Sequence, residues 1–116
     1  MMEANPLELV RLVRSLAVLA LPAEEQFRWL ASLGLGEPAL TDELALELEN
    51  AVLAAPELVA AGWLRSEALQ LARNLDAKLE SRSGPAAGSF WSIEALRNDP
   101  EWADIRVQAV EALMAL

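Results

Sequence analysis

The stretch Asp99-Pro-Glu-Trp-Ala-Asp-Ile-Arg-Val-Gln-Ala-Val-Glu-Ala-Leu-Met-Ala-Leu116 combines a defined helix start with a helical period. Asp99 is a preferred N-cap residue, Pro100 fits the first helical position, and Glu101 suits the positive end of the helix dipole. Apolar residues then recur every three or four positions, at Trp102, Ile105, Ala109, Ala112, Leu113 and Leu116. The polar residues between them fall on the opposite face. The stretch therefore predicts one amphipathic helix with one buried side.

The same start and stop signals divide the rest of the chain into helices. Asn5-Pro6 repeats the pattern of cap and proline, and glycine or proline stands near the end of most apolar stripes. The first two helices are expected from Pro6 to about Ala20 and from Pro22 to Gly34 or Gly36. The third is expected from a cap at Thr41 to Pro56, where the chain breaks or restarts as a short helical piece that ends at Gly62. Two further helices are expected from a cap at Ser66 to near Arg82 and from a cap at Ser92 to Arg97. Residues 83–89 are expected to form a loop, because their Gly, Pro and Ser residues do not support a helix.

Composition favours an all-α fold. Apolar residues make up 54% of the 116 residues and charged residues 23%, far from the composition of disordered chains. Leu, Ala and Glu dominate, whereas β-branched and aromatic residues are scarce. The length suits one hydrophobic core, and short connections favour antiparallel neighbours. We therefore expect residues 1–116 to form a single domain, a compact bundle of five to six helices.

The first helix contains a basic start before an apolar run, a pattern that a signal peptide shares. Arg11 and Arg14 precede the apolar residues, but Glu3 and Glu8 offset their charge. An amphipathic stripe is already present, with Leu9, Leu12, Val13 and Leu16 on one side and Glu8, Arg11 and Ser15 on the other. We therefore expect a buried first helix rather than a cleaved signal. No apolar run reaches the roughly 18 residues that a membrane span requires.

The chain lacks the residues that most catalytic and metal sites use. It has no His, no Cys and no Tyr, which excludes thiol and His-based catalysis and the usual zinc ligands. A Ser–Lys pair would depend on Lys78 alone, and residues 84–88 lack the Lys of a phosphate loop. Glu43 and Glu47 share a helix face, but no Glu-x-x-Glu pair, as used by the all-helical pyrophosphohydrolases, occurs. We expect no enzyme activity, no cofactor and no metal ion.

Negative charge is concentrated in one region. Residues 29–64 contain no Lys and no Arg but hold Glu37, Asp42, Glu43, Glu47, Glu49 and Glu57, which amount to two-thirds of the net charge of −9. Such a region repels nucleic acid and attracts basic proteins. We interpret Asp42, Glu43, Glu47 and Glu49 as candidate residues for binding a basic partner. The alternative is a solvated acidic face without a partner.

Four tryptophans offer further candidates. Trp29, Trp63 and Trp102 sit within or beside apolar stripes and are expected in the core. Phe90-Trp91 follows the expected loop directly, and two adjacent aromatic residues cannot easily enter the same core. One of them is therefore expected near the surface, where an exposed Trp can anchor a partner. In the alternative, both are tucked under the loop.

Some apolar residues fall outside all these stripes, namely Val18, Leu35, Leu46, Leu53 and Leu71, and residues 112–116 end on apolar side chains. Apolar surface left over from a core usually indicates a partner, most simply a second copy of the chain. We therefore expect a homodimer. An apolar pocket lined by Trp63 and Trp102 would instead indicate a small-ligand binder or an enzyme.

The segment Trp91-Ser-Ile-Glu-Ala-Leu-Arg-Asn-Asp-Pro-Glu-Trp-Ala-Asp-Ile-Arg106 resembles the closing part of small, uncharacterised helical proteins of bacteria. These proteins are associated with the immunity partners of polymorphic toxins. The resemblance covers only the last part of the chain. It implies a small acidic protein that binds without catalysis, and it supplies no functional residues.

The sequence as a whole predicts a non-catalytic interaction protein. Asp42, Glu43, Glu47 and Glu49 would attract a basic partner and Trp91 would anchor it, most concretely in an immunity protein or similar inhibitor of a basic toxin. A cysteine-free chain fits the reducing cytoplasm, and the preference for Arg over Lys fits a GC-rich bacterial genome. We expect no contact with nucleic acid or membrane. The alternatives are a homodimeric structural protein and a small-ligand binder with an interhelical pocket.

Overall fold

The computed structural model describes residues 4–34, 41–82 and 85–116. Its α-helices are α1 (Pro6–Ala20), α2 (Ala23–Ser32), α3 (Glu43–Ala60), α4 (Ser66–Glu80), α5 (Ile93–Asn98) and α6 (Pro100–Met114), with a 3-10 helix, η1 (Pro85–Trp91), before α5. Within these residues the expected all-α class and helix number are confirmed. Leu35, Gly36, Glu37, Ser83 and Gly84 lie outside the described residues.

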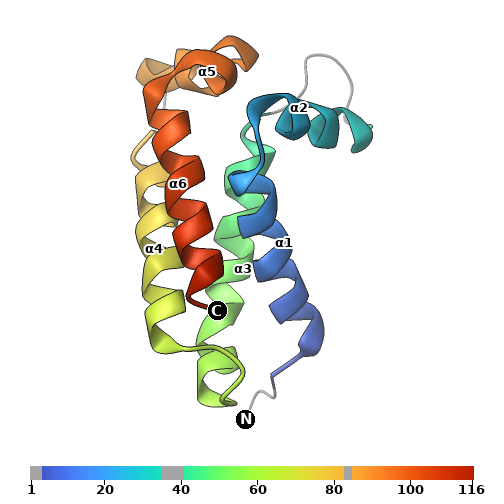
Figure 1. Cartoon of the computed structure of the whole chain (residues 1–116), viewed down its shortest axis with the longest axis vertical. Coiled ribbons are helices and arrows are strands. Elements are labelled where there is room, and N and C mark those ends of the chain that lie inside the picture. The colour runs from blue at the N-terminus through green and yellow to red at the C-terminus, as the bar shows by residue number, and fades with distance from the viewer. Residues whose placement is uncertain (1–3, 35–40, 83–84) are drawn as a thin grey trace.

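Four long helices, α1, α3, α4 and α6, form an antiparallel bundle (Figure 1). α1 packs against α3 and α6, and α4 packs against the same two helices. Each long helix therefore has two neighbours, and the outer surface divides into faces between adjacent helices. α2 and α5 lie across one end of the bundle in contact with each other, and η1 packs against α5.

The interior is filled mainly by leucine from every long helix except α6, which contributes Trp102 and Ile105. The largest fully buried side chains are Trp102, Leu12, Leu16, Leu19, Leu30, Leu44, Leu48, Leu58, Leu75, Leu79, Leu96 and Ile105. Burial of these side chains is the dominant stabilising contribution, since each one removed from water contributes about 1.5–3 kcal/mol.

Three helix starts follow the sequence prediction. The side chains of Asn5, Ser92 and Asp99 accept hydrogen bonds from the backbone N–H groups of Leu7, Ala95 and Glu101. Proline occupies the first turn of α1 and of α6, where no backbone partner is lost. The first and last long helices therefore begin where their caps predict.

Two predicted caps are wrong. α3 begins after Asp42 and α4 begins at Ser66 itself, after Arg65, and neither cap residue accepts a side-chain hydrogen bond. Asp42 already has helical dihedral angles, so it cannot adopt the extended backbone of a typical N-cap. Thr41 is buried instead, and its hydroxyl has no partner among the described residues.

Pro56 does not break the chain as predicted, because α3 runs through it from Glu43 to Ala60. Proline removes one backbone hydrogen bond and disfavours the preceding turn. Ala55 and Leu58, on either side of it, are fully buried in the same core as Leu48. Tertiary packing therefore overrides the local preference, and α3 ends only near Gly62, whose positive φ of 80° suits glycine.

The buried side of α1 is rotated relative to the predicted stripe. Ser15 and Val18 are buried, whereas Val13 is exposed. The hydroxyl of Ser15 donates to the backbone oxygen of Leu12 at 2.9 Å, which satisfies the buried hydroxyl within its own helix. Among the described residues, no helix is long and apolar enough to cross a bilayer.

The second and fifth helices are joined by an ion pair that local spacing does not predict. Glu24 stands one turn before Arg28, but its carboxylate accepts from Nε of Arg97 in α5 at 2.6 Å, and Arg28 pairs with Glu25. Packing of α2 against α5 brings Arg97 close. The expected loop at 83–89 is also partly structured, because η1 begins at Pro85.

Candidate functional site

The acidic residues that the sequence groups on α3 point in two directions. Glu43 and Glu47 lie one turn apart on the side facing α1, where Oε1 of Glu47 is 4.0 Å from Nη2 of Arg14. Glu49 lies on the other side, where its charge acts on α4. Asp42 is seven residues from Glu49 and shares that side. The candidate set therefore divides between two faces of the bundle.

A like-charged cluster lies between α3 and α4. The pKa of Asp76 in α4 is raised, chiefly by partial burial and then by repulsion from Glu49 and from Glu80. A raised carboxyl pKa means that the charged form is disfavoured where it stands. A cationic group of a partner placed beside Asp76 and Glu49 would relieve this repulsion.

Two exposed leucines lie on the same side of α3 as Asp42 and Glu49. Leu46 is 43% exposed and Leu53 is 75% exposed. One side of the helix carries, at successive spacings of four, three, four and four positions, the residues Asp42, Leu46, Glu49, Leu53 and Glu57. We call these five residues the α3 strip. Its three carboxylates make no ion pair with any described residue, unlike the carboxylates of Glu8, Glu24, Glu25, Glu47, Glu101 and Asp104.

Phe90 and Trp91 form a cluster with Trp102, and neither of the two is an exposed side chain. The Phe90 ring stacks on Trp102 with centroids 4.7 Å apart, and Trp91 meets Trp102 edge-on at 5.9 Å. The indole N–H of Trp102 donates to the backbone oxygen of Phe90, and that of Trp91 donates to the backbone oxygen of Arg82, both at 2.8 Å. Phe90 is buried and Trp91 is half-buried. The 3-10 geometry of η1 lets both adjacent rings reach the core.

The other tryptophans do not form a shared pocket. Trp102 is fully buried in the first turn of α6, but Trp63 is 45% exposed, contrary to the prediction that it belongs to the core. Trp63 follows α3 at the end of the bundle opposite to the start of α6 (Figure 1). Trp29 is half-buried, with the guanidinium of Arg14 5.9 Å from its ring centroid. Trp63 and Trp102 therefore cannot line one interhelical cavity.

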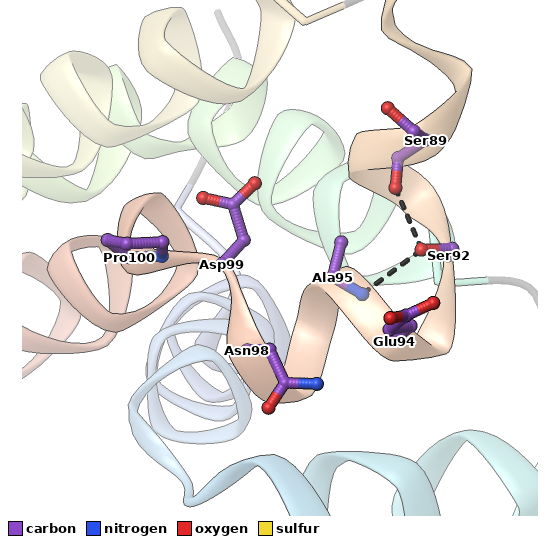
Figure 2. Close-up of a pocket in the computed structure, with 7 residues that line it drawn as sticks. All are labelled: Ser89, Ser92, Glu94, Ala95, Asn98, Asp99 and Pro100. Atoms are coloured by element: carbon purple, nitrogen blue, oxygen red, sulfur yellow. Dashed lines mark hydrogen bonds between the residues drawn. The ribbon is translucent and has the colours of Figure 1, made fainter.

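An open depression of about 420 Å³ lies around α5 (Figure 2). Its lining includes two cap residues, Ser92 and Asp99, whose side chains are already used. The hydroxyl of Ser92 accepts from the backbone N–H of Ala95 and donates to the backbone oxygen of Ser89. Asp99 accepts from Glu101. These polar groups terminate helices, and the depression presents no arrangement of nucleophile and base.

A buried polar network was not predicted from the sequence. Gln26 in α2 is fully buried; its amide donates to the backbone oxygens of Val18 and Leu19, and Oε1 accepts from Nε and Nη2 of Arg106. Arg106 also donates to the backbone oxygen of Leu96, and burial lowers its pKa. The only sequence signal is Gln26 standing four residues before the apolar Leu30. The network joins α1, α2, α5 and α6 and is structural.

Comparisons with protein-family models, curated proteins and solved structures find no match to this chain. Among the described residues, no group of three or more acidic side chains is arranged to hold a metal ion. The α3 strip therefore remains the candidate site, defined by its own geometry and charge.

Proposed function

We propose that the protein is a non-catalytic binding protein that holds a basic partner on the α3 strip. The observation that carries the proposal is the combination of exposed Leu46 and Leu53 with unpaired Asp42, Glu49 and Glu57 along one helix side. Apolar anchors surrounded by charged residues are typical of protein interfaces, where the rim directs the partner and the centre holds it. An acidic face that contacted only solvent would not account for the two exposed leucines among its carboxylates.

The spacing of the strip indicates the chemistry of the partner. Leu46 and Leu53 stand two turns apart, roughly 10 Å along the helix axis. A basic amphipathic helix with apolar residues at the same spacing would contact both leucines and place Lys or Arg near Glu49 and Asp76. The raised pKa of Asp76 supports this site in particular, because repulsion already present there would fall on binding.

An immunity protein or inhibitor of a basic toxin in the bacterial cytoplasm is the most concrete form of this proposal. The net charge of −9 would accelerate association with a basic protein at low ionic strength. The absence of Cys fits the cytoplasm but does not require it. The proposal needs no cofactor, no metal ion and no catalytic residue.

A synthetic basic helix tests the proposal without a known partner. The probe carries Leu at seven-residue spacing between Lys and Arg residues, and its affinity is measured by isothermal titration calorimetry. Leu53→Ala should weaken binding about 5- to 30-fold, since truncating a central apolar anchor commonly costs about 1–2 kcal/mol. Glu49→Gln should slow association, with the larger effect at low salt.

Met114→Ala is the matched control. Met114 is 82% exposed and apolar but lies in α6, away from α3. It should leave the affinity for the basic helix unchanged. Equal losses for Leu53→Ala and Met114→Ala would show nonspecific apolar adsorption, and binding that ignored Glu49→Gln at low salt would remove the electrostatic role of the strip.

A further inference from the structure

A second exposed apolar surface lies on the opposite side of the molecule from the α3–α4 cluster. Val107, Val110 and Met114 recur at three- and four-residue spacing on α6, and all three are exposed. Val10 and Val13 are exposed on α1, which packs against α6. We call these five residues the α1/α6 face.

Ion pairs mark where this face ends on each helix. On α6, Glu101 and Asp104 pair with Arg82 and Lys78, and they mark the side that faces α4. The valines and Met114 lie on the remaining outer surface, where Val110 borders α1.

On α1, the pairing of Arg14 with Glu47 marks the side that faces α3. Val13 lies on the side next to α6, and Val10, four positions before Arg14, lies on the outer surface between these two sides. α1 and α6 run antiparallel, so the first half of α1 lies beside the last half of α6 (Figure 1). Val10 in the first half of α1 and Val110 and Met114 in the last half of α6 therefore lie toward the same end of the bundle.

Charge distinguishes this face from the α3 strip. Glu101 and Asp104 of α6 pair with Arg82 and with Lys78 of α4, and Glu8 of α1 pairs with Arg11. Glu111 stands four positions after Val107 and three before Met114, so it lies at the edge of the face. Within the described helices α1 and α6, carboxylates thus border the α1/α6 face at its α4 edge, through Asp104 and Glu111, in a chain whose net charge is −9. The nearest bases, Arg14 and Arg106, are already held by Glu47 and by Gln26. The centre of the surface is neutral and apolar.

We propose that the α1/α6 face is the interface of a homodimer and that a second copy of this chain covers it. Two copies of an acidic protein repel at most of their surface, and at the centre of this face apolar side chains rather than carboxylates would meet. A two-fold axis would place each apolar face against an identical one, which is self-complementary without any charge. A basic partner gains nothing from this neutral surface.

The available apolar area is compatible with a dimer interface. A fully exposed aliphatic side chain presents on the order of 100 Å² of apolar area. The five side chains, which are 37% to 82% exposed, therefore present on the order of 300 Å². A standard interface buries about 800 Å² per partner, roughly 60% of it apolar. The five residues would supply more than half of that apolar area, and half-buried Leu9 and Leu113 flank them.

Sedimentation velocity over a micromolar concentration series tests the proposal. The wild-type chain should sediment as a dimer, and Val107→Lys should weaken the dimer about 100-fold, because the interface would remove water from the ammonium group and would lose an apolar contact. This change lowers the net negative charge, so increased repulsion cannot explain the loss. Asp104 and Glu111 stand three positions before and four after Val107, which supports a Lys within the helix.

Leu53→Lys is the matched control, since it makes the same charge change on the α3 strip, and it should leave the dimer intact. Circular dichroism on the diluted proteins checks folding, and Val10→Lys gives the same test from α1. A wild-type chain that stays monomeric throughout overturns the proposal, as does a dimer lost only in Leu53→Lys. A monomer that binds neutral phosphatidylcholine vesicles also overturns it and assigns the face to lipid.

Discussion

Replacing Gln26 by Leu removes the centre of the network that joins four helices. The change deletes two donations to the backbone oxygens of Val18 and Leu19, at 3.1 and 3.0 Å, and two acceptances from Arg106, at 3.1 and 2.9 Å. Leu fits a similar volume, so the main effect is loss of polar partners rather than creation of a cavity.

The expected cost follows from which groups are left without partners. The Val18 oxygen still accepts from Leu21 at 3.2 Å, and Arg106 still donates to the Leu96 oxygen. The Leu19 oxygen loses its side-chain partner, and part of a guanidinium is buried unpaired; each such group costs about 1–3 kcal/mol. After allowance for the apolar surface gained, we expect the free energy of unfolding to fall by about 2–3 kcal/mol.

Urea denaturation followed by circular dichroism measures this change. Thermal unfolding should show a midpoint lower by roughly 10 °C, given the enthalpy expected for a domain of this size. Gln70→Leu is the control, because Gln70 bonds only to Asn74 on an exposed helix surface and should cost less than about 0.5 kcal/mol. If both variants had the same stability, the network would not hold the four helices together.

Two further changes test the helix caps and the charged residues of the bundle. Asp99→Ala should cost about 1 kcal/mol, while Pro100→Ala should cost less, because only Asp99 accepts a capping hydrogen bond; urea denaturation compares them. The raised pKa of Asp76 means that stability falls as pH rises from 3.8 through the folded-state pKa, so Asp76→Asn should stabilise the protein at neutral pH but not at strongly acidic pH. The pKa of Asp104 shifts in the opposite direction, since the hydrogen bond from Lys78 lowers it. The contribution of Asp104 to folding stability is therefore present at neutral pH and is lost below pH 3.8. Carboxyl NMR titration should place the pKa of Asp76 above 3.8 and that of Asp104 below 3.8.

Helix starts could be predicted where the side chain itself supplies the cap. Asn5, Ser92 and Asp99 each accept a backbone N–H within their own turn, so local sequence contains the whole interaction. Thr41 failed as a cap because the backbone is already helical at Asp42. Pro56 failed as a break because buried neighbours on α3 stabilise the helix across it. Both failures come from packing over long sequence distances.

The candidate site was predicted in part. Periodicity placed Glu43 and Glu47 on one helix side, but it could not say which neighbour each side would face; Glu47 approaches Arg14, and Glu49 acts on Asp76. The sequence marked Leu46 and Leu53 only as apolar residues outside the predicted buried stripes. In the fold both leucines are exposed, beside Asp42, Glu49 and Glu57 of the α3 strip. Gln26 could not be assigned, because Arg106 lies 80 residues away in sequence.

Mapping the basic helical probe onto the protein by NMR is the most direct test of the proposed binding surface. The measurement follows the backbone amides of isotopically labelled protein during titration with the probe at low salt. The proposal predicts the largest shifts at Leu46, Glu49 and Leu53, with Val107 and Met114 unchanged. Shifts centred on α6, or no shifts at any accessible concentration of the basic helix, would contradict it.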